Sequence, residues 1–290
     1  MKLGVSSYCY YRLLGKDGFD IYKLIKTVKE TGFEGIEFVR IPGEENVSDV
    51  FELCAEIKKI CSDEGLEIIN YCTNSDFIAG SDGDWDIEKE IELVKHHVDR
   101  AETLGTKHMR NDAGWGVGRG VPPPRGFDDY LDRIVYGYKE VTKYAEKKNI
   151  VMSIENHGQF VQDSLRVEKI INKVGSPNFG ALIDIGNFLC VDEDPSYAVG
   201  ILAPYVKHVH VKDFHVKSGM LRNPGQGYFR TRGGNYIRGA IVGHGNAPVD
   251  QCVELLKNQG YNGYLSIEFE GLEDPVLGTT IGKKYLEQLI

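Results

Sequence analysis

The stretch that decides the fold is residues 150–158, which read IVMSIENHG. Its first five residues are apolar except for Ser153, and they run directly into Glu155, Asn156 and His157. An apolar run of this kind is typical of a strand covered on both faces, as in a parallel sheet. A strand that ends in a carboxylate, an amide and an imidazole indicates that its C-terminal end opens onto a site that uses these groups.

The same design recurs three times later in the chain. Each recurrence is a mostly apolar run that ends in, or carries near its end, a hard or borderline metal ligand. The three are residues 179–187 with Asp184, residues 206–214 with His210, and residues 264–271 with Glu268. Four strands of buried type that each deliver such a side chain describe a metal site better than they describe a hydrophobic core.

Strands and helices alternate along the whole chain, and glycines follow several of the predicted helices. We expect strands at residues 3–8, 35–39, 66–73, 106–112, 150–158, 179–187, 206–214 and 264–271. We expect helices at residues 21–31, 48–64, 87–104, 128–148, 163–174, 195–203, 249–259 and 274–289. The links between them are short, and no shift in composition marks a domain boundary.

This alternation predicts an α/β fold, a single (β/α)8 TIM barrel that spans residues 1–290 as one domain. The main alternative is a doubly wound open sheet. It is disfavoured because no Gly-rich phosphate loop follows the first strand, and because polar residues lie at many strand ends rather than at one switch point.

Two segments interrupt the alternation. Residues 113–126 are rich in glycine and contain three consecutive prolines, so we expect a loop. Residues 215–247 replace a short link after the seventh strand, and in a barrel they rise from the C-terminal face, where active sites lie. We expect this long loop to cover that face. A surface or oligomer-contact excursion is the alternative.

Charge and composition narrow the functional classes. The net charge of −9 argues against a nucleic-acid partner, because phosphate affinity comes from clustered Lys and Arg. No apolar run approaches the roughly 20 residues of a membrane helix, and the first residues lack the apolar core of a signal peptide. The six cysteines form no CxxC pair, so we expect buried free thiols. We therefore expect a cytoplasmic protein without nucleic-acid or membrane partners, and we leave a homo-oligomer open.

The side chains at the ends of the fifth to eighth strands form a candidate metal site. In a closed barrel those four ends form one arc of the mouth, so the side chains can converge. They are Glu155, Asp184, His210 and Glu268. Three carboxylates with one imidazole suit Mn²⁺, Mg²⁺, Co²⁺ or Fe²⁺, and Zn²⁺ is less favoured than at sites rich in His or Cys. We expect one divalent metal ion, with Mn²⁺ first.

Four segments resemble the xylose isomerase-like barrel superfamily. They are SIENH at residues 153–157, DIGN at 184–187, HVHVKD at 208–213 and GYNGYLSIE at 260–268. Within it they are most similar to the sugar phosphate isomerase/epimerase group, which includes ketose 3-epimerases and inosose-processing enzymes. The resemblance covers nearly the whole chain and is strongest in its second half.

The resemblance implies that the four residues of the candidate site bind one divalent metal. It further implies that Glu155 and Glu268 are the catalytic acid/base pair on opposite faces of a bound sugar. The expected function is a metal-dependent sugar isomerase or epimerase that moves a proton next to a carbonyl through a metal-stabilised enediolate. One carboxylate removes the proton and the other returns one, while the metal stabilises the developing charge.

The chain departs from the ketose 3-epimerase pattern at two positions. Asn187 stands three residues after Asp184, where those enzymes typically carry His, and Val216 stands six residues after His210, where they carry Arg. Other polar residues are predicted to contact a substrate, a sugar or cyclitol. The predicted set is His157, Asn187, Lys212, Arg238, His244, Glu37 and Arg110. Trp85 and Trp115 are candidates for stacking on a sugar.

Three alternatives stay open. A lyase or dehydratase acting on an inosose or a 3-keto-glycoside would use the same metal and base, followed by loss of a β-substituent. A DNA-repair endonuclease on the same barrel would need many more histidines than this acidic chain supplies. A non-catalytic sugar-binding subunit is disfavoured because both Glu155 and Glu268 are present.

Overall fold

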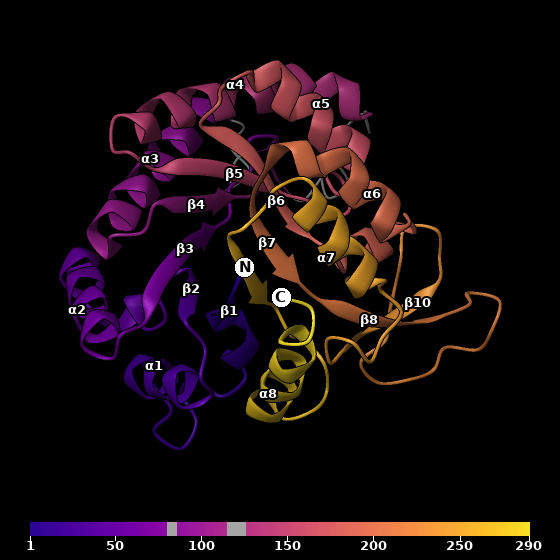
Figure 1. Ribbon diagram of the computed structural model, residues 1–290. Helices are drawn as coiled ribbons and strands as arrows, with labels where there is room; N and C mark the ends of the chain where they lie inside the picture. The colour runs from indigo at the N-terminus through magenta and orange to yellow at the C-terminus, as the bar shows by residue number, and fades with distance from the viewer. Residues whose placement is uncertain (80–85, 115–125) are drawn as a thin grey trace.

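Eight parallel strands close into a barrel in a computed structural model of the protein, which describes residues 1–79, 86–114 and 126–290 (Figure 1). The strands are β1 (Lys2–Ser6), β2 (Gly35–Val39), β3 (Glu67–Thr73), β4 (His108–Asn111), β5 (Val151–Glu155), β6 (Phe179–Asp184), β7 (Val206–Val211) and β11 (Tyr264–Ile267). Neighbours around the barrel follow the order of the chain, and β11 pairs with both β7 and β1. The predicted closed barrel is confirmed.

Eight α-helices in the described part of the chain surround the barrel, seven of them between successive barrel strands and α8 after the last one (Figure 1). They are α1 (Ile21–Glu30), α2 (Val50–Asp63), α3 (Ile87–Leu104), α4 (Phe127–Glu146), α5 (Ser164–Val174), α6 (Pro195–Leu202), α7 (Val249–Asn258) and α8 (Pro275–Leu286). Several begin with an aspartate whose carboxylate accepts backbone N–H bonds of the first turn, as Asp20 does for α1 and Asp86 for α3. The sequence therefore sets most helix starts locally.

Strand register brings the functional ends of three strands level with one another. Asp184 on β6 stands opposite His210 on β7, and Ser266 on β11 stands opposite the same histidine. Glu155, the last residue of β5, stands opposite Leu182 on β6. Because parallel strands present their carboxyl ends at one face of a barrel, this register gathers the polar strand ends there.

The segment after β7 departs from the prediction of one strand over residues 206–214 and a loop over 215–247. The barrel strand ends at Val211, and a new strand, β8 (Asp213–Lys217), begins two residues later. It forms an antiparallel sheet, in the order β8-β10-β9, with β9 (Phe229–Arg230) and β10 (Tyr236–Ala240). The sequence analysis did not predict these strands, because the pairing of β8 with β10 is not visible in local sequence.

Asp213 ties the two ends of this segment together. Its carboxylate accepts backbone hydrogen bonds from Gly243 N at 3.1 Å, Gly245 N at 2.7 Å and Ala247 N at 3.0 Å, besides one from Phe214 N at 2.8 Å. In Figure 1 the segment continues from β7 and projects beyond the ring of helices. Its predicted role as a cover for the C-terminal face stays a prediction.

Three further sequence predictions have separate outcomes. All six cysteines are free and buried, as expected. Within residues 1–79, 86–114 and 126–290, no helix is both long and apolar enough to cross a bilayer. Most of the predicted loop at 113–126, together with Trp85 and Trp115, lies outside the described residues.

Candidate metal centre

Four buried side chains from consecutive units of the barrel converge at its mouth. Glu155 and Asp184 are the last residues of β5 and β6, His210 is the penultimate residue of β7, and Glu268 directly follows β11. One potential ligand atom from each lies within 4.8 Å of those of the other three. The sequence predicted this set, and the structure brings all four together.

Asn156 links the end of β5 to the end of β6 through two hydrogen bonds. Its side-chain oxygen accepts a hydrogen bond from Asp184 N at 2.8 Å, and its amide nitrogen donates to Asp184 O at 2.9 Å. A buried asparagine that satisfies both backbone groups of its neighbour acts as a rigid spacer. Glu155 and Asp184 therefore keep a fixed separation.

The two oxygens of the Asp184 carboxylate have different contacts. Oδ1 accepts backbone hydrogen bonds from Gly186 N at 2.9 Å and Asn187 N at 3.1 Å. Oδ2 is buried, makes no hydrogen bond, and lies 3.3 Å from Lys212 Nζ. Gly186 is required because a Cβ there would lie 2.6 Å from Lys212 O. A buried oxygen left without a hydrogen bond beside other carboxylates is suited to a cation.

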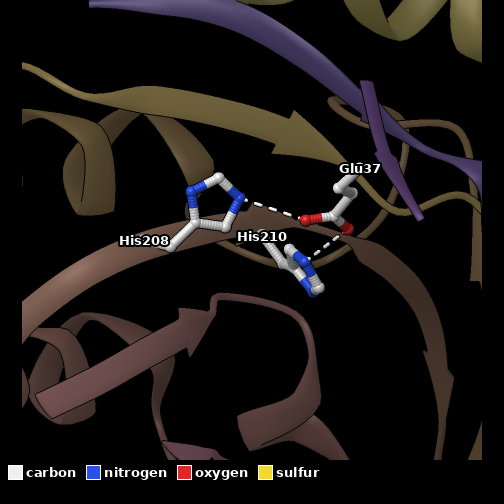
Figure 2. Close-up of side chains that lie close together, drawn as sticks. All are labelled: Glu37, His208 and His210. Atoms are coloured by element: carbon white, nitrogen blue, oxygen red, sulfur yellow. Dashed lines mark hydrogen bonds and ion pairs between the residues drawn. The ribbon is translucent and has the colours of Figure 1, made fainter. Parts of the chain in front are cut away.

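The His210 ring has one nitrogen on each side of the cluster. Its Nδ1 lies 3.3 Å from Glu155 Oε1 and 3.7 Å from Glu268 Oε1. Its Nε2 lies 2.7 Å from Glu37 Oε1, as Figure 2 shows. Nδ1 is therefore the nitrogen that faces the other candidate ligands.

Lys212 places an ammonium group among the carboxylates. Its Nζ lies 2.5 Å from Glu268 Oε2 and 3.8 Å from Glu270 Oε2, and it donates a hydrogen bond to Asn187 Oδ1 at 3.2 Å. Asn187 Nδ2 in turn donates to Glu155 Oε1 at 3.3 Å. Two predicted substrate contacts, Lys212 and Asn187, thus lie directly against the candidate ligands.

The crowding of acids and bases perturbs their protonation. Burial, reinforced by the neighbouring Glu268 and Glu155, raises the pKa of Asp184 to about 7 although Lys212 opposes the shift. Burial would also raise the pKa of Glu268, but Lys212 and His210 outweigh it and lower that pKa to about 2. The two pKa values shift in opposite directions because the Lys212 ammonium lies closer to Glu268, at 2.5 Å, than to Asp184, at 3.3 Å. With a pKa of about 7 and no further cation, Asp184 is about half protonated at neutral pH.

The donor set fits a divalent metal ion. Three carboxylates and one imidazole nitrogen, all buried, are ligands that Mn²⁺, Mg²⁺, Co²⁺ and Fe²⁺ accept, and Zn²⁺ accepts them too. Oδ2 of Asp184, which has no hydrogen-bond partner, is an atom that such an ion would satisfy, and Nδ1 of His210 faces the same carboxylates. The identity of the ion stays a prediction.

A second group of charges flanks Glu155 on the side of β4. Arg110, buried on β4, holds Glu155 Oε2 through Nε at 2.8 Å and Asp112 Oδ2 through Nη1 at 3.2 Å. Asp112 Oδ2 also lies 2.9 Å from Nδ1 of His157, whose side chain is 29% exposed. Burial would lower the pKa of His157, but Asp112 prevails and raises it. The result is an imidazole at the mouth, oriented by a buried carboxylate.

The remaining predicted contacts have different surroundings. Glu37 is fully buried on β2 behind His210. Arg238 lies on β10 with its guanidinium 5.4 Å from the ring of Tyr228, and His244 lies in the turn where its N–H donates to Ile241 O. For these three residues, substrate contact stays a prediction.

Three residues that shape the site, Asp112, Asn156 and His208, were assigned no role from the sequence. Asn156 directly follows the predicted ligand Glu155, and Asp112 is the last residue of the strand predicted over residues 106–112, so a position at a strand end was the available signal. His208 stands two residues before His210 on one strand, so both side chains point to the same side. That spacing of two could have identified it.

The chain belongs to the xylose isomerase-like TIM barrel family, whose model matches residues 25–289. An inosose dehydratase of Bacillus thuringiensis (strain Al Hakam) is 26% identical over 153 residues, which are 52% of this chain and 50% of that protein. An inosose dehydratase of Mesomycoplasma hyopneumoniae is 25% identical over 279 residues, which are 90% of this chain and 84% of that protein. The match to the Bacillus relative spans about half its length.

Solved structures share the fold over nearly the full chain. A probable 3-DHS dehydratase from Bacillus anthracis has a TM-score of 0.75 at 19% identity, with 99% of both chains covered. The 3-keto-D-glucoside 4-epimerase of E. coli has a TM-score of 0.72 at 17% identity, with 99% of both chains covered. The D-psicose 3-epimerase of Clostridium cellulolyticum H10 has a TM-score of 0.75 at 15% identity, covering 100% of this chain and 99% of that one. At these identities the likeness shows the fold alone.

Proposed function

We propose that the protein is a divalent-metal-dependent sugar isomerase or epimerase that moves a proton next to a carbonyl group. The observation that carries the proposal is the convergence of Glu155 and Glu268 on His210 Nδ1, at 3.3 and 3.7 Å. Two carboxylates at one cation site can serve as proton acceptor and proton donor to the same bound substrate. The substrate in this proposal is a small sugar or cyclitol.

We propose that Glu155, Asp184, His210 and Glu268 hold the ion, with Mn²⁺ first and Mg²⁺, Co²⁺, Fe²⁺ or Zn²⁺ as alternatives. When bound, the ion polarises the substrate carbonyl and stabilises the negative charge that develops on its oxygens. All four side chains are buried, so water is largely kept from the reacting atoms.

Each of the two proposed catalytic carboxylates has its own counter-charge. Glu268 lies 2.5 Å from Lys212 Nζ, which keeps the carboxylate ionised and able to accept a proton. Glu155 is held through Oε2 by Arg110 Nε at 2.8 Å, which fixes the direction of Oε1. One carboxylate removes a proton from the carbon beside the carbonyl, and the other returns one. Return to the opposite face gives an epimer, and transfer between adjacent carbons gives an isomer.

Residues near the mouth of the barrel are the proposed substrate contacts. His157, Asn187, Lys212 and Arg110 lie against the cluster and are proposed to bind substrate hydroxyl groups. Arg238 and His244 belong to the segment after β7, which we propose covers a bound substrate. The 3-keto-D-glucoside 4-epimerase and the D-psicose 3-epimerase have the same fold, so the proposed reaction is one that this fold accommodates.

The experiment is solvent deuterium uptake followed by NMR. Mn²⁺-loaded protein is incubated in heavy water with a panel of ketoses, inososes and 3-keto-glycosides. Uptake at a carbon beside the carbonyl, together with a new epimer or isomer, is the expected result. Glu155→Gln should abolish the uptake, whereas Glu90→Gln, which alters a buried carboxylate on α3, should keep it. Equal deuterium uptake with the parent protein and with Glu155→Gln would contradict the proposal.

A dehydratase is the second candidate, and the pair formed by Asp112 and His157 favours it. An imidazole oriented at 2.9 Å by a buried carboxylate is a proton donor suited to a leaving hydroxyl group. The sequence relatives named above are inosose dehydratases. The same NMR experiment separates the two candidates, because a dehydratase releases water and forms a carbon–carbon double bond.

A further inference from the structure

Glu37 is a buried carboxylate in the wall of the barrel, behind the candidate metal centre. It lies at the middle of β2, has no exposed surface, and stands opposite Ser6 on β1 and Asn70 on β3. Burying a carboxylate this completely is costly unless charged or polar partners surround it. The partners of Glu37 therefore indicate why it is there.

Both carboxylate oxygens of Glu37 are engaged. Oε1 lies 2.7 Å from Nε2 of His210, and Oε2 lies 3.1 Å from Nε2 of His208. Figure 2 shows each of the two imidazole rings directed at a different oxygen of the carboxylate. Asn70 Nδ2 also donates to Oε2 at 3.2 Å.

His208 and Asn70 both contact Oε2 of the Glu37 carboxylate. The rings of His208 and His210 are nearly perpendicular, at 82°, with centroids 5.7 Å apart. The register between β2 and β3 shifts between Ile36 and Glu37, and this shift brings Asn70 level with Glu37. With Oε2 held by two partners, Oε1 has a fixed position against His210.

We infer that Glu37 is a positioning residue that fixes the tautomer and the ring orientation of His210, so that Nδ1 faces the metal ion. The inference rests on the proposed function, because it assumes that His210 is a metal ligand. A histidine ligand commonly donates its second N–H to a carboxylate, which sets the tautomer and strengthens the ligand. Here Nε2 carries that proton toward Glu37, and Nδ1 keeps its lone pair for the ion.

The distance between Glu37 and His210 argues against a second metal site at these residues. Glu37, His208 and His210 could themselves be read as three ligands. Two atoms bound to one ion at about 2.0–2.2 Å each lie about 3 Å or more apart. The 2.7 Å between Glu37 Oε1 and His210 Nε2 is shorter than that and is the separation of a close, buried ion pair.

The experiment measures metal binding to the full chain. Mn²⁺ affinity and stoichiometry are determined by calorimetry for the parent protein, Glu37→Gln, Glu37→Ala and the control Glu90→Gln. Glu90→Gln also changes a buried carboxylate, one that accepts a hydrogen bond from Asp76 N at 2.7 Å. We expect one ion per chain in the parent, and a Kd raised about 10–100-fold in both Glu37 variants but unchanged in the control.

A second readout reports on His210 without any Glu37 variant. In ¹⁵N-histidine-labelled protein loaded with diamagnetic Zn²⁺, His210 should show a proton on Nε2 that exchanges slowly with solvent. His210→Gln identifies the signal by removing it. In Co²⁺-loaded protein, Glu37→Gln should also change the visible absorption bands, which a loss of general stability would leave unchanged.

The outcomes are distinct. Unchanged affinity in folded Glu37→Gln, or a proton on Nδ1 of His210 instead of Nε2, overturns the positioning role but leaves the proposed function standing. Two ions per parent chain, with one lost in Glu37→Gln, would make Glu37 a ligand and overturn the inference as well. A parent protein that binds no divalent ion overturns the proposed function and the inference together.

Discussion

Lys212 Nζ lies 2.5 Å from Glu268 Oε2 and on its other side faces Asp184 Oδ2 at 3.3 Å. One ammonium group therefore contacts carboxylates from two units of the barrel that are both candidate metal ligands. The positive charge of Lys212 offsets the negative charge of these two carboxylates, at the place where a metal ion is expected to bind. Several consequences can be measured.

Lys212→Met should destabilise the metal-free protein. Removing one partner of a buried ion pair leaves uncompensated charge and costs about 3–5 kcal/mol. A divalent ion should restore much of the loss, because it supplies positive charge to the same carboxylates. Thermal unfolding with and without Mn²⁺ measures both effects. The rise in Tm on adding Mn²⁺ should be larger for Lys212→Met than for the parent.

Lys59→Met is the matched control, because that lysine pairs with Asp63 on the exposed face of α2. It should leave the free energy of unfolding nearly unchanged and the effect of Mn²⁺ untouched, because an exposed ion pair contributes little to stability. If Lys212→Met were no less stable than Lys59→Met, Lys212 would not be balancing the carboxylate cluster.

Glu155→Gln and Glu268→Gln should each lower the turnover of the true substrate by about 10²–10⁴-fold. Each removes one of the two groups proposed to move protons, so neither should be rescued by raising the substrate concentration. Steady-state kinetics at saturating Mn²⁺ tests this. Because both residues are also proposed ligands, metal content is measured alongside, and the kinetics are compared at full occupancy.

Metal binding should release more protons at pH 6 than at pH 8. The pKa of Asp184 is about 7 in the metal-free protein, against an ordinary value of 3.8, so below pH 7 the folded chain holds an extra proton. The stability from that raised pKa is present at low pH and is lost as the pH rises through 7. Mn²⁺ must displace the proton, so affinity should rise with pH and level off above about 7.

Calorimetry in buffers with different ionisation enthalpies counts the released protons. The pKa of His210 is raised well above its ordinary value because its three carboxylate neighbours outweigh burial. We expect about one proton more at pH 6 than at pH 8. Equal release at the two pH values would show that Asp184 is already ionised.

The barrel and its candidate ligands could be predicted from sequence for one physical reason. A strand buried on both faces carries a continuous apolar run, so a carboxylate at its end stands out. Glu155, Asp184 and Glu268 were identified in this way, and His210 by its place in the corresponding strand. The closure of the barrel then brought these strand ends together.

The rest depended on pairings that a single strand does not reveal. Glu37 was predicted as a substrate contact because it lies on a strand, yet its neighbours are histidines 171 and 173 residues away. Its partner Asn70 depends on a register shift between β2 and β3. The sheet formed by β8, β9 and β10 is built across a glycine-rich segment, where strand propensity is weak.

Asp213→Asn should loosen the segment that follows β7. The carboxylate accepts hydrogen bonds from four backbone N–H groups, three of them from residues 243, 245 and 247 at the far end of the segment. An asparagine has one acceptor oxygen, and its NH₂ group would face N–H donors, so two of the four backbone N–H groups, at least one of them only partly buried, would lose their partner. Each such loss costs about 1–3 kcal/mol. The space for adjustment is small, because a Cβ on Gly245 would already overlap the Asp213 carboxylate.

The expected result of Asp213→Asn is therefore a free energy of unfolding lower by about 2–4 kcal/mol, with faster proteolysis within residues 215–247. Asp63→Asn, at an exposed position on α2, should change neither quantity. If the segment covers the substrate, Asp213→Asn should also raise KM more than it lowers kcat, while Mn²⁺ affinity stays near that of the parent. A variant with parental stability and parental proteolysis would show that Asp213 does not hold the two ends together. A variant that is destabilised but keeps the parental KM would limit Asp213 to the fold and remove the segment from the substrate site.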